Sequence, residues 1–313
     1  MHRNLILAIT TTACLAFLAC GEKAPLEKDF QPLFNGRDLE GWETATGFRV
    51  KNGCILSDEE GAGNLFTARD YGNYILRLDY MLSEVGNSGV VIRADPDSAW
   101  QTGFEVQLLA PWTPFRDDLH CTGSIYGYVA VTNRPDETTG RWHSLEVVCD
   151  RKTIIVSVDG QACSWANMDQ VESLQGKALS GRIGLQGNHS DPQEWVRFRN
   201  LRLRELDLDP DYVVQGLRST DPRLRHQAHA AAVSLQAAAI DPLCRLLASP
   251  DSVGPSAARQ ALFAIAAEAS EPDADTLYKK AVRQALATAA DSAGVKTVRA
   301  YLNWLDGMLA GGN

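Results

Sequence analysis

The segment from Phe30 to Leu206 consists of many short runs in which apolar and polar residues alternate. A period of two places successive side chains on opposite faces of a β-strand. Turn signals such as Asn52-Gly53 and Asp159-Gly160 stand between the runs, and the sequence suggests no helix among them. Many short strands at this spacing are typical of a sandwich or barrel rather than of a parallel α/β fold. We therefore predict a mainly β domain over residues 30–206.

The run VSVDGQACSW predicts a β-hairpin, because Asp159-Gly160 supplies the positive φ angles of a tight turn. Cys149 and Cys163 then lie on neighbouring predicted strands and could form a disulfide. The cysteines beyond residue 20 are scattered and contain no CxxC pair, so the sequence predicts no zinc site.

The composition changes abruptly near Asp207. Residues 207–313 are rich in alanine and leucine at helical spacing, with Asp-Pro pairs at 209–210, 221–222 and 241–242 that resemble helix starts. The motif RHQA recurs as ARQA about one helical hairpin later. We predict a small all-α domain of HEAT-like repeats over 207–313, with a generic helical bundle as the alternative. Its expected role is contact, either with a protein partner or with the β-domain.

Residues 1–20 have the pattern of an export signal: a short basic start, an apolar run from Leu5 to Phe17, and small residues before Cys20. The stretch FLACG resembles a bacterial lipobox with Cys20 as the acylated residue. We expect a lipoprotein signal peptide at 1–20, a linker at 21–29, and an exported protein that is lipid-anchored to the bacterial membrane, on the periplasmic or cell-surface side. A plain signal peptide or a single anchor helix is the alternative.

The net charge of −9 argues against nucleic-acid binding, which needs a basic face to neutralise phosphates. A hydrophobic content of 45% and a charged content of 22% are ordinary globular values, so general disorder is not expected. The composition suits an exported protein that handles a neutral ligand.

Two predicted neighbouring strands, GNSGVVIR (86–93) and GFEVQLL (103–109), carry polar side chains on one face. Alternation places Arg93 with Gly89 on the first strand and Glu105 with Gln107 on the second. A buried Arg93–Glu105 pair would be costly unless it worked with a ligand or a hydrogen-bond network. The alternative is a cross-strand ion pair on a wetted sheet.

Six motifs occur in order between residues 32 and 206: PLFNGRDLEGW, GNSGVVIR, GFEVQLL, TGSIYG, GRWHSLEVV and GRIGLQGNHSDPQEWVRFRNLRLREL. Together they resemble the 3-keto-disaccharide hydrolase domain family, and the resemblance covers residues 30–206. It implies a concanavalin A-like, two-sheet jelly-roll sandwich. The helical segment lies outside it.

The resemblance also implies a carbohydrate substrate already oxidised at carbon 3 of a glucosyl unit. The ketone acidifies the proton at carbon 2, so the glycosidic bond can leave by elimination through an enolate, followed by addition of water. This route needs a base, a group that stabilises the ketone oxygen and a donor to the leaving oxygen. It leaves a divalent metal near Glu105 open. The implied roles are Glu105 as base, Arg93 at the oxyanion, His189 as acid or metal ligand, and Asn87, Gln107, Tyr126, Gln186 and Trp100 in substrate binding.

The alternative function is a non-catalytic carbohydrate-binding module of a surface lipoprotein. It would use the same face, with stacking on Trp100 and Trp112 in place of proton transfer. A third reading makes the β-domain a structural unit that binds a protein partner.

Overall fold

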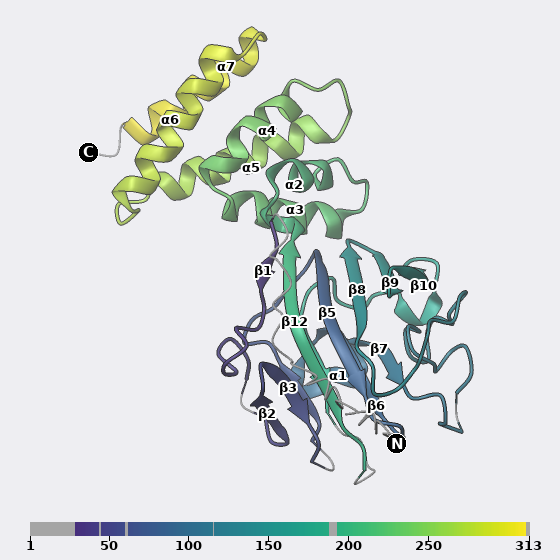
Figure 1. The fold of residues 1–313 in the computed structure, drawn as a ribbon. Coiled ribbons are helices and arrows are strands. Elements are labelled where there is room, and N and C mark those ends of the chain that lie inside the picture. Colours follow the sequence, from purple (N-terminus) through teal and green to yellow (C-terminus); the bar gives the residue numbers. More distant parts are fainter. Residues whose placement is uncertain (1–28, 44, 60–61, 115, 188–192, 311–313) are drawn as a thin grey trace, which may run out of the picture.

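A computed structural model describes residues 29–310 except 44, 60–61, 115 and 188–192, and it shows a β-sandwich followed by helices (Figure 1). Every strand pair in the described chain is antiparallel. The larger sheet has the order β10-β9-β8-β5-β12-β3-β2, with β1 beside β12, and the smaller has the order β4-β11-β6-β7. The strands are β1 (Gln31–Pro32), β2 (Phe48–Lys51), β3 (Cys54–Ser57), β4 (Asn64–Phe66), β5 (Tyr74–Leu82), β6 (Asn87–Ala94), β7 (Phe104–Leu109), β8 (His143–Asp150), β9 (Thr153–Val158), β10 (Gln161–Asn167), β11 (Arg182–Gln186) and β12 (Val196–Glu205).

One apolar core fills the space between the two sheets. Alternate residues of β7, namely Phe104, Val106 and Leu108, enter this core from the smaller sheet. Leu76 and Leu78 of β5 enter it from the larger sheet. This packing confirms the predicted two-sheet jelly-roll sandwich.

The predicted hairpin is confirmed as β9–β10, with positive φ at Asp159 (49°) and Gly160 (77°). The predicted pairing of Cys149 with Cys163 is wrong, since both are buried free thiols. The physical reason is the strand order: β9 lies between β8, which carries Cys149, and β10, which carries Cys163. The two cysteines therefore lie on strands that are not adjacent in the sheet.

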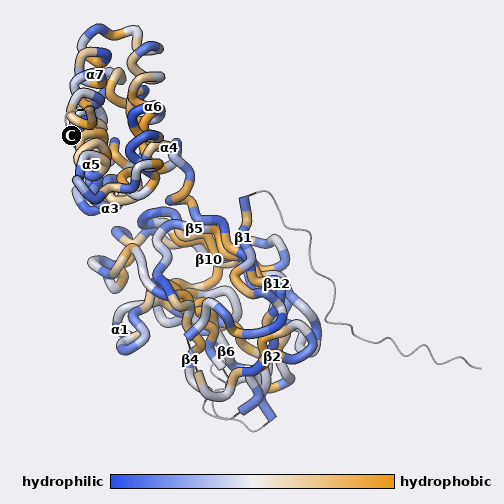
Figure 2. Tube along the Cα trace, turned by 90° about the vertical axis from the view of Figure 1, so that its left-hand side faces the viewer, coloured by the Kyte–Doolittle hydropathy of each residue, from blue (hydrophilic) through white to orange (hydrophobic). Residues whose placement is uncertain are grey.

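The helical part begins directly after β12 and stands at one end of the sandwich (Figures 1 and 2). It has its own apolar core, to which each of its helices contributes. Its helices are α2 (Pro210–Gly216), α3 (Pro222–Ser234), α4 (Ala237–Leu247), α5 (Gly254–Ser270), α6 (Thr276–Ser292) and α7 (Lys296–Ala310). None of the helices in the described ranges is long and apolar enough to cross a membrane. The predicted signal peptide and Cys20 lie outside the described residues.

Two of the three Asp-Pro pairs start helices as predicted. The Asp209 and Asp221 side chains accept hydrogen bonds from backbone N–H groups in the first turns of α2 and α3. The third prediction is wrong, because Pro242 lies inside α4, which begins at Ala237. Packing of the apolar face of α4 against the helical core outweighs the hydrogen bond that this proline removes.

A bulge near the end of β6 changes the direction of Arg93. The pairing of β6 with β11 shifts register between Arg182 and Gly184, and Arg93 has a φ of 53°. Its fully buried guanidinium donates to the carbonyl oxygens of Gly72 (3.0 Å) and Arg151 (2.8 Å), in the loops at one end of the larger sheet. The prediction that Arg93 shares a face with Glu105 is therefore wrong.

Arg93 should contribute strongly to stability, because its removal leaves a cavity and two buried carbonyl groups without a donor. We expect Arg93→Ala to lower the free energy of unfolding by about 3 kcal/mol in urea denaturation. Exposed Arg37→Ala is the control and should change it by less than about 0.5 kcal/mol. Equal changes in the free energy of unfolding for the two substitutions would contradict this contribution of Arg93 to stability.

Candidate functional site

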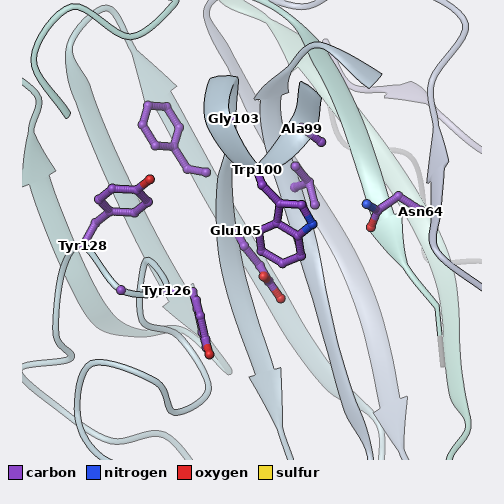
Figure 3. Close-up of a pocket in the computed structure, with 10 residues that line it drawn as sticks. Asn64, Ala99, Trp100, Gly103, Glu105, Tyr126 and Tyr128 are labelled. Carbon is purple, nitrogen blue, oxygen red and sulfur yellow. The ribbon is translucent and has the colours of Figure 1, made fainter. Parts of the chain in front are cut away.

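A pocket of about 320 Å³ lies on the outer face of the smaller sheet, beside the short helix α1 (Ala99–Thr102). Figure 3 shows the Glu105 side chain at its centre with Trp100 beside it, Tyr126 and Tyr128 on one side and Asn64 on the other. The described lining residues are Asn64, Val91, Ala99, Trp100, Gly103, Phe104, Glu105, Tyr126, Gly127 and Tyr128. Glu105 is the single acidic or basic side chain in this set.

The strand register explains why these residues meet. Val91 pairs with Glu105, and Asn64 pairs with Gln186 on the neighbouring strands. These residues alternate with the core residues of their strands, so their side chains project from the outer face. The predicted adjacency of residues 86–93 and 103–109 is confirmed, and so is the polar character of this face.

Glu105 is nearly inaccessible, with 6% of its surface exposed. Burial raises the pKa of its carboxyl from 4.5 to about 8, and a hydrogen bond from Gln186 offsets part of this rise. Because burial penalises the charged form, the group is mainly a neutral acid at pH 7. A carboxyl whose pKa lies near the working pH can both take up and release a proton.

A glycine makes room for this carboxyl. A Cβ atom at Gly89 would lie 2.3 Å from Oε1 of Glu105. Any larger residue at this position would push the carboxyl out of its place. Gly89, which carries no polar group in its side chain, is thus a site residue that the sequence patterning did not single out.

Two amide oxygens at the site have no hydrogen-bond partner among the described residues. They are Oδ1 of Asn64 and Oε1 of Gln186, and both are buried. Buried polar atoms are normally satisfied, so these two are suited to accept hydrogen bonds from ligand hydroxyls. Asn64 was missed by the sequence analysis. The sequence gives little indication of Asn64, because strand β4 has only three residues. Leu65 is the one residue of β4 in the core between the sheets, which is too short a pattern to recognise as alternation.

Aromatic rings form the rest of the pocket wall. Trp100 is 59% exposed and Tyr126 is 39% exposed, so both can contact a ligand. The ring of His120 meets that of Tyr126 edge-on at 4.7 Å, and its Nδ1 lies 2.7 Å from Asp117 Oδ1. This Asp117–His120 pair, also missed from the sequence, contacts the ring of Tyr126 and helps to position it.

The structure brings together Glu105, Gln186, Tyr126 and Trp100 of the predicted site. Gln107 and Asn87 lie along the same face but bond to each other, with Gln107 Nε2 donating to Asn87 Oδ1 at 2.9 Å. Arg93 points elsewhere. Trp112 is 74% exposed and is not among the described lining residues. His189 lies outside the described residues.

The described residues do not form a metal centre. No group of three or more His, Cys, Asp or Glu side chains comes together in the described ranges in a way that could hold an ion. Among the described residues, the polar groups near Glu105 are the amides of Gln186 and Asn64 and the hydroxyls of Tyr126 and Tyr128, all neutral. This donor set alone does not fit a divalent metal, which favours several carboxylate or imidazole ligands.

Buried Glu105 should give stability a pH dependence. The folded-state pKa of about 8 exceeds the ordinary value of 4.5, so the contribution of the protonated group is complete below pH 4.5 and is lost as the pH rises through 8. Glu105→Gln stays neutral. We expect its stability relative to the wild type to increase between pH 5 and pH 9, by at most about 5 kcal/mol at about 1.4 kcal/mol per pKa unit.

Urea unfolding near pH 5, 7 and 9 measures this difference. Glu172→Gln, at an exposed position, is the matched control and should differ from the wild type by the same amount at each pH. If the free energy of unfolding of Glu105→Gln also differed from that of the wild type by a constant amount at each pH, the raised pKa would be contradicted.

Comparison with known proteins agrees with the fold. Two crystal structures of candidate glycosyl hydrolases from Parabacteroides distasonis ATCC 8503 share the fold, at 22% and 21% identity and TM-scores of 0.52 and 0.51. The alignments cover 56% and 58% of this chain and 98% of each of those chains. No curated protein sequence matches. The profile of the 3-keto-alpha-glucoside-1,2-lyase-like domain matches residues 29–204, more than half of the chain, and the chain therefore belongs to that family.

Proposed function

We propose that this protein cleaves neutral 3-keto-glycosides by elimination across carbons 1 and 2 of the oxidised sugar, with Glu105 as the base. The observation that carries the proposal is a buried carboxyl, of pKa about 8, at the centre of a pocket whose other described lining residues are uncharged. Membership of the lyase-like family supports the same chemistry.

The proposed reaction begins at carbon 2, whose proton is acidified by the ketone at carbon 3. The Glu105 carboxylate takes this proton, and the electron pair left on carbon 2 is delocalised as an enolate. The enolate re-forms the ketone as the bond between carbon 1 and the glycosidic oxygen breaks. The electron pair of the enolate becomes the second bond between carbons 1 and 2. The leaving oxygen departs with the electron pair of the broken bond to carbon 1 and receives a proton. An unsaturated 3-keto sugar remains, and addition of water to it yields the free 3-keto sugar.

The pocket offers neutral groups to the substrate. The unpartnered oxygens of Asn64 and Gln186 would accept hydrogen bonds from sugar hydroxyls, and the Tyr126 hydroxyl would donate toward the ketone oxygen. Arg93 is not assigned to the ketone, because its guanidinium is buried elsewhere. We retain His189 as the proposed acid for the leaving oxygen.

The absence of a basic side chain among the described lining residues favours an uncharged sugar over a uronic acid. A carboxylate on the substrate would have to be buried close to Glu105 without a cation to pair it. We also retain the proposals that Cys20 anchors the protein to a bacterial membrane by lipid, and that the helical region contacts a protein partner.

Release of the aglycone from a chromogenic 3-keto-glucoside, beside the unoxidised glucoside, tests the proposal. We expect release from the keto form alone, with a rate that rises with pH through about 8 as Glu105 ionises. Glu105→Gln should reduce the rate by at least about a thousandfold while keeping most of the binding. Glu172→Gln should leave it unchanged.

Binding of the keto sugar without release, with and without divalent metal, would instead favour the non-catalytic carbohydrate-binding module. The exposed ring of Trp100 is the feature that such a module would use.

Gly89→Ala tests the position of the carboxyl without changing any polar group. Because the added Cβ would collide with Oε1, we expect kcat to fall by about a hundredfold. The control is Gly307→Ala, in α7 with open space around it. Gly127→Ala does not serve as a control, because Gly127 has a positive φ. Full activity of Gly89→Ala would contradict the assigned geometry.

A further inference from the structure

Lys177 makes four contacts beside the pocket, two with the backbone at the end of helix α1 and two with aromatic rings of the pocket wall. It follows the turn η2 (Glu172–Leu174) and precedes β11. Its Nζ donates to the carbonyl oxygens of Gln101 (3.0 Å) and Gly103 (2.9 Å). The same Nζ lies 5.0 Å from the ring centroid of Phe104 and 4.9 Å from that of Tyr128.

These contacts stabilise the short helix α1. Helix α1, which carries Trp100, has only four residues, and so short a helix has little stability of its own. Its internal contacts include a hydrogen bond from Gly103 N–H to Ala99 O at 2.9 Å. Lys177 reaches it from more than seventy residues further along the chain. It therefore ties the end of this turn to the body of the sandwich.

The position of Trp100 matters for one part of the ligand. Glu105 is buried at the base of the pocket, while the Trp100 ring is exposed at its entrance. In the pose that the proposed function assumes, carbon 2 of the sugar lies at Glu105 and the group on carbon 1 extends toward the entrance. A leaving group that contains a ring can contact the indole there, whereas a methyl group is too small to do so.

We propose that Lys177 is a positioning residue that holds the Trp100 side of the pocket and thereby sets the affinity for substrates with a cyclic leaving group, either aryl or sugar. The inference rests on the proposed function for its substrate, but the tie to α1 can be measured without any substrate. Lys177 touches no reacting atom in this account and acts through Trp100, Phe104 and Tyr128.

The test compares an aryl with a methyl 3-keto-glucoside in the full protein. In Lys177→Met, which keeps the apolar stem and loses the charge, we expect KM for the aryl substrate to rise about fivefold to tenfold. The kcat values, and KM for the methyl substrate, should stay within about twofold. Lys177→Arg keeps a cation and N–H donors, so its KM for the aryl substrate should return most of the way to the wild-type value. Lys280→Met, at an exposed position of α6, is the charge-loss control.

Amide hydrogen exchange of residues 99–103 gives the second readout, without substrate. The Gly103 amide should exchange at least about tenfold faster in Lys177→Met than in the wild type or in Lys280→Met. Unchanged exchange, or an unchanged ratio of the two KM values, would overturn the inference. If the wild type cleaves neither keto-glucoside, the proposed function fails. The exchange result alone then decides whether Lys177 stabilises helix α1 beside the pocket.

Discussion

The packing of the smaller sheet against the larger one determines which side chains can reach the pocket. Phe104, Val106 and Leu108 of β7 enter the shared core, and strand geometry then obliges Glu105 to face outward. The same packing fixes the register of β6, so that Gly89 lies beneath the carboxyl. A slip of one residue in either strand would exchange the two faces and bury charge in the core.

The site is built at some cost to the fold. Glu105 lies in a setting that disfavours its charged form, and the amide oxygens of Asn64 and Gln186 are buried without a partner among the described residues. Such features are destabilising in a free protein and become favourable only when a ligand supplies hydroxyl groups or a proton. Lys177 offsets this locally by donating to the backbone carbonyls of Gln101 and Gly103 beside the pocket. Arg93 stabilises a different part of the sandwich, the loops at one end of the larger sheet.

Much of this could be predicted from local patterns. Alternation predicts the two-faced strand around Glu105 and its pairing with residues 86–93, a turn dipeptide predicts the β9–β10 hairpin, and composition predicts the change to helices near residue 207. The errors concern non-local contacts. Arg93 leaves the expected face because of a bulge that depends on the register between β6 and β11, which are far apart in sequence. Cys149 and Cys163 are separated because β9 lies between their strands. Asn64 enters the site because β4 pairs with β11, which no local pattern indicates.

The central claim is that Glu105 removes the proton at carbon 2, and exchange of that proton with solvent tests it most directly. A 3-keto-C-glucoside has no glycosidic oxygen, so the enolate cannot release an aglycone oxygen and is reprotonated instead. Incubation in deuterated water, followed by NMR, should show deuterium entering carbon 2 with the wild type and at no more than the buffer rate with Glu105→Gln. Saturable binding of this ligand to the wild type without exchange above the buffer rate would contradict the account.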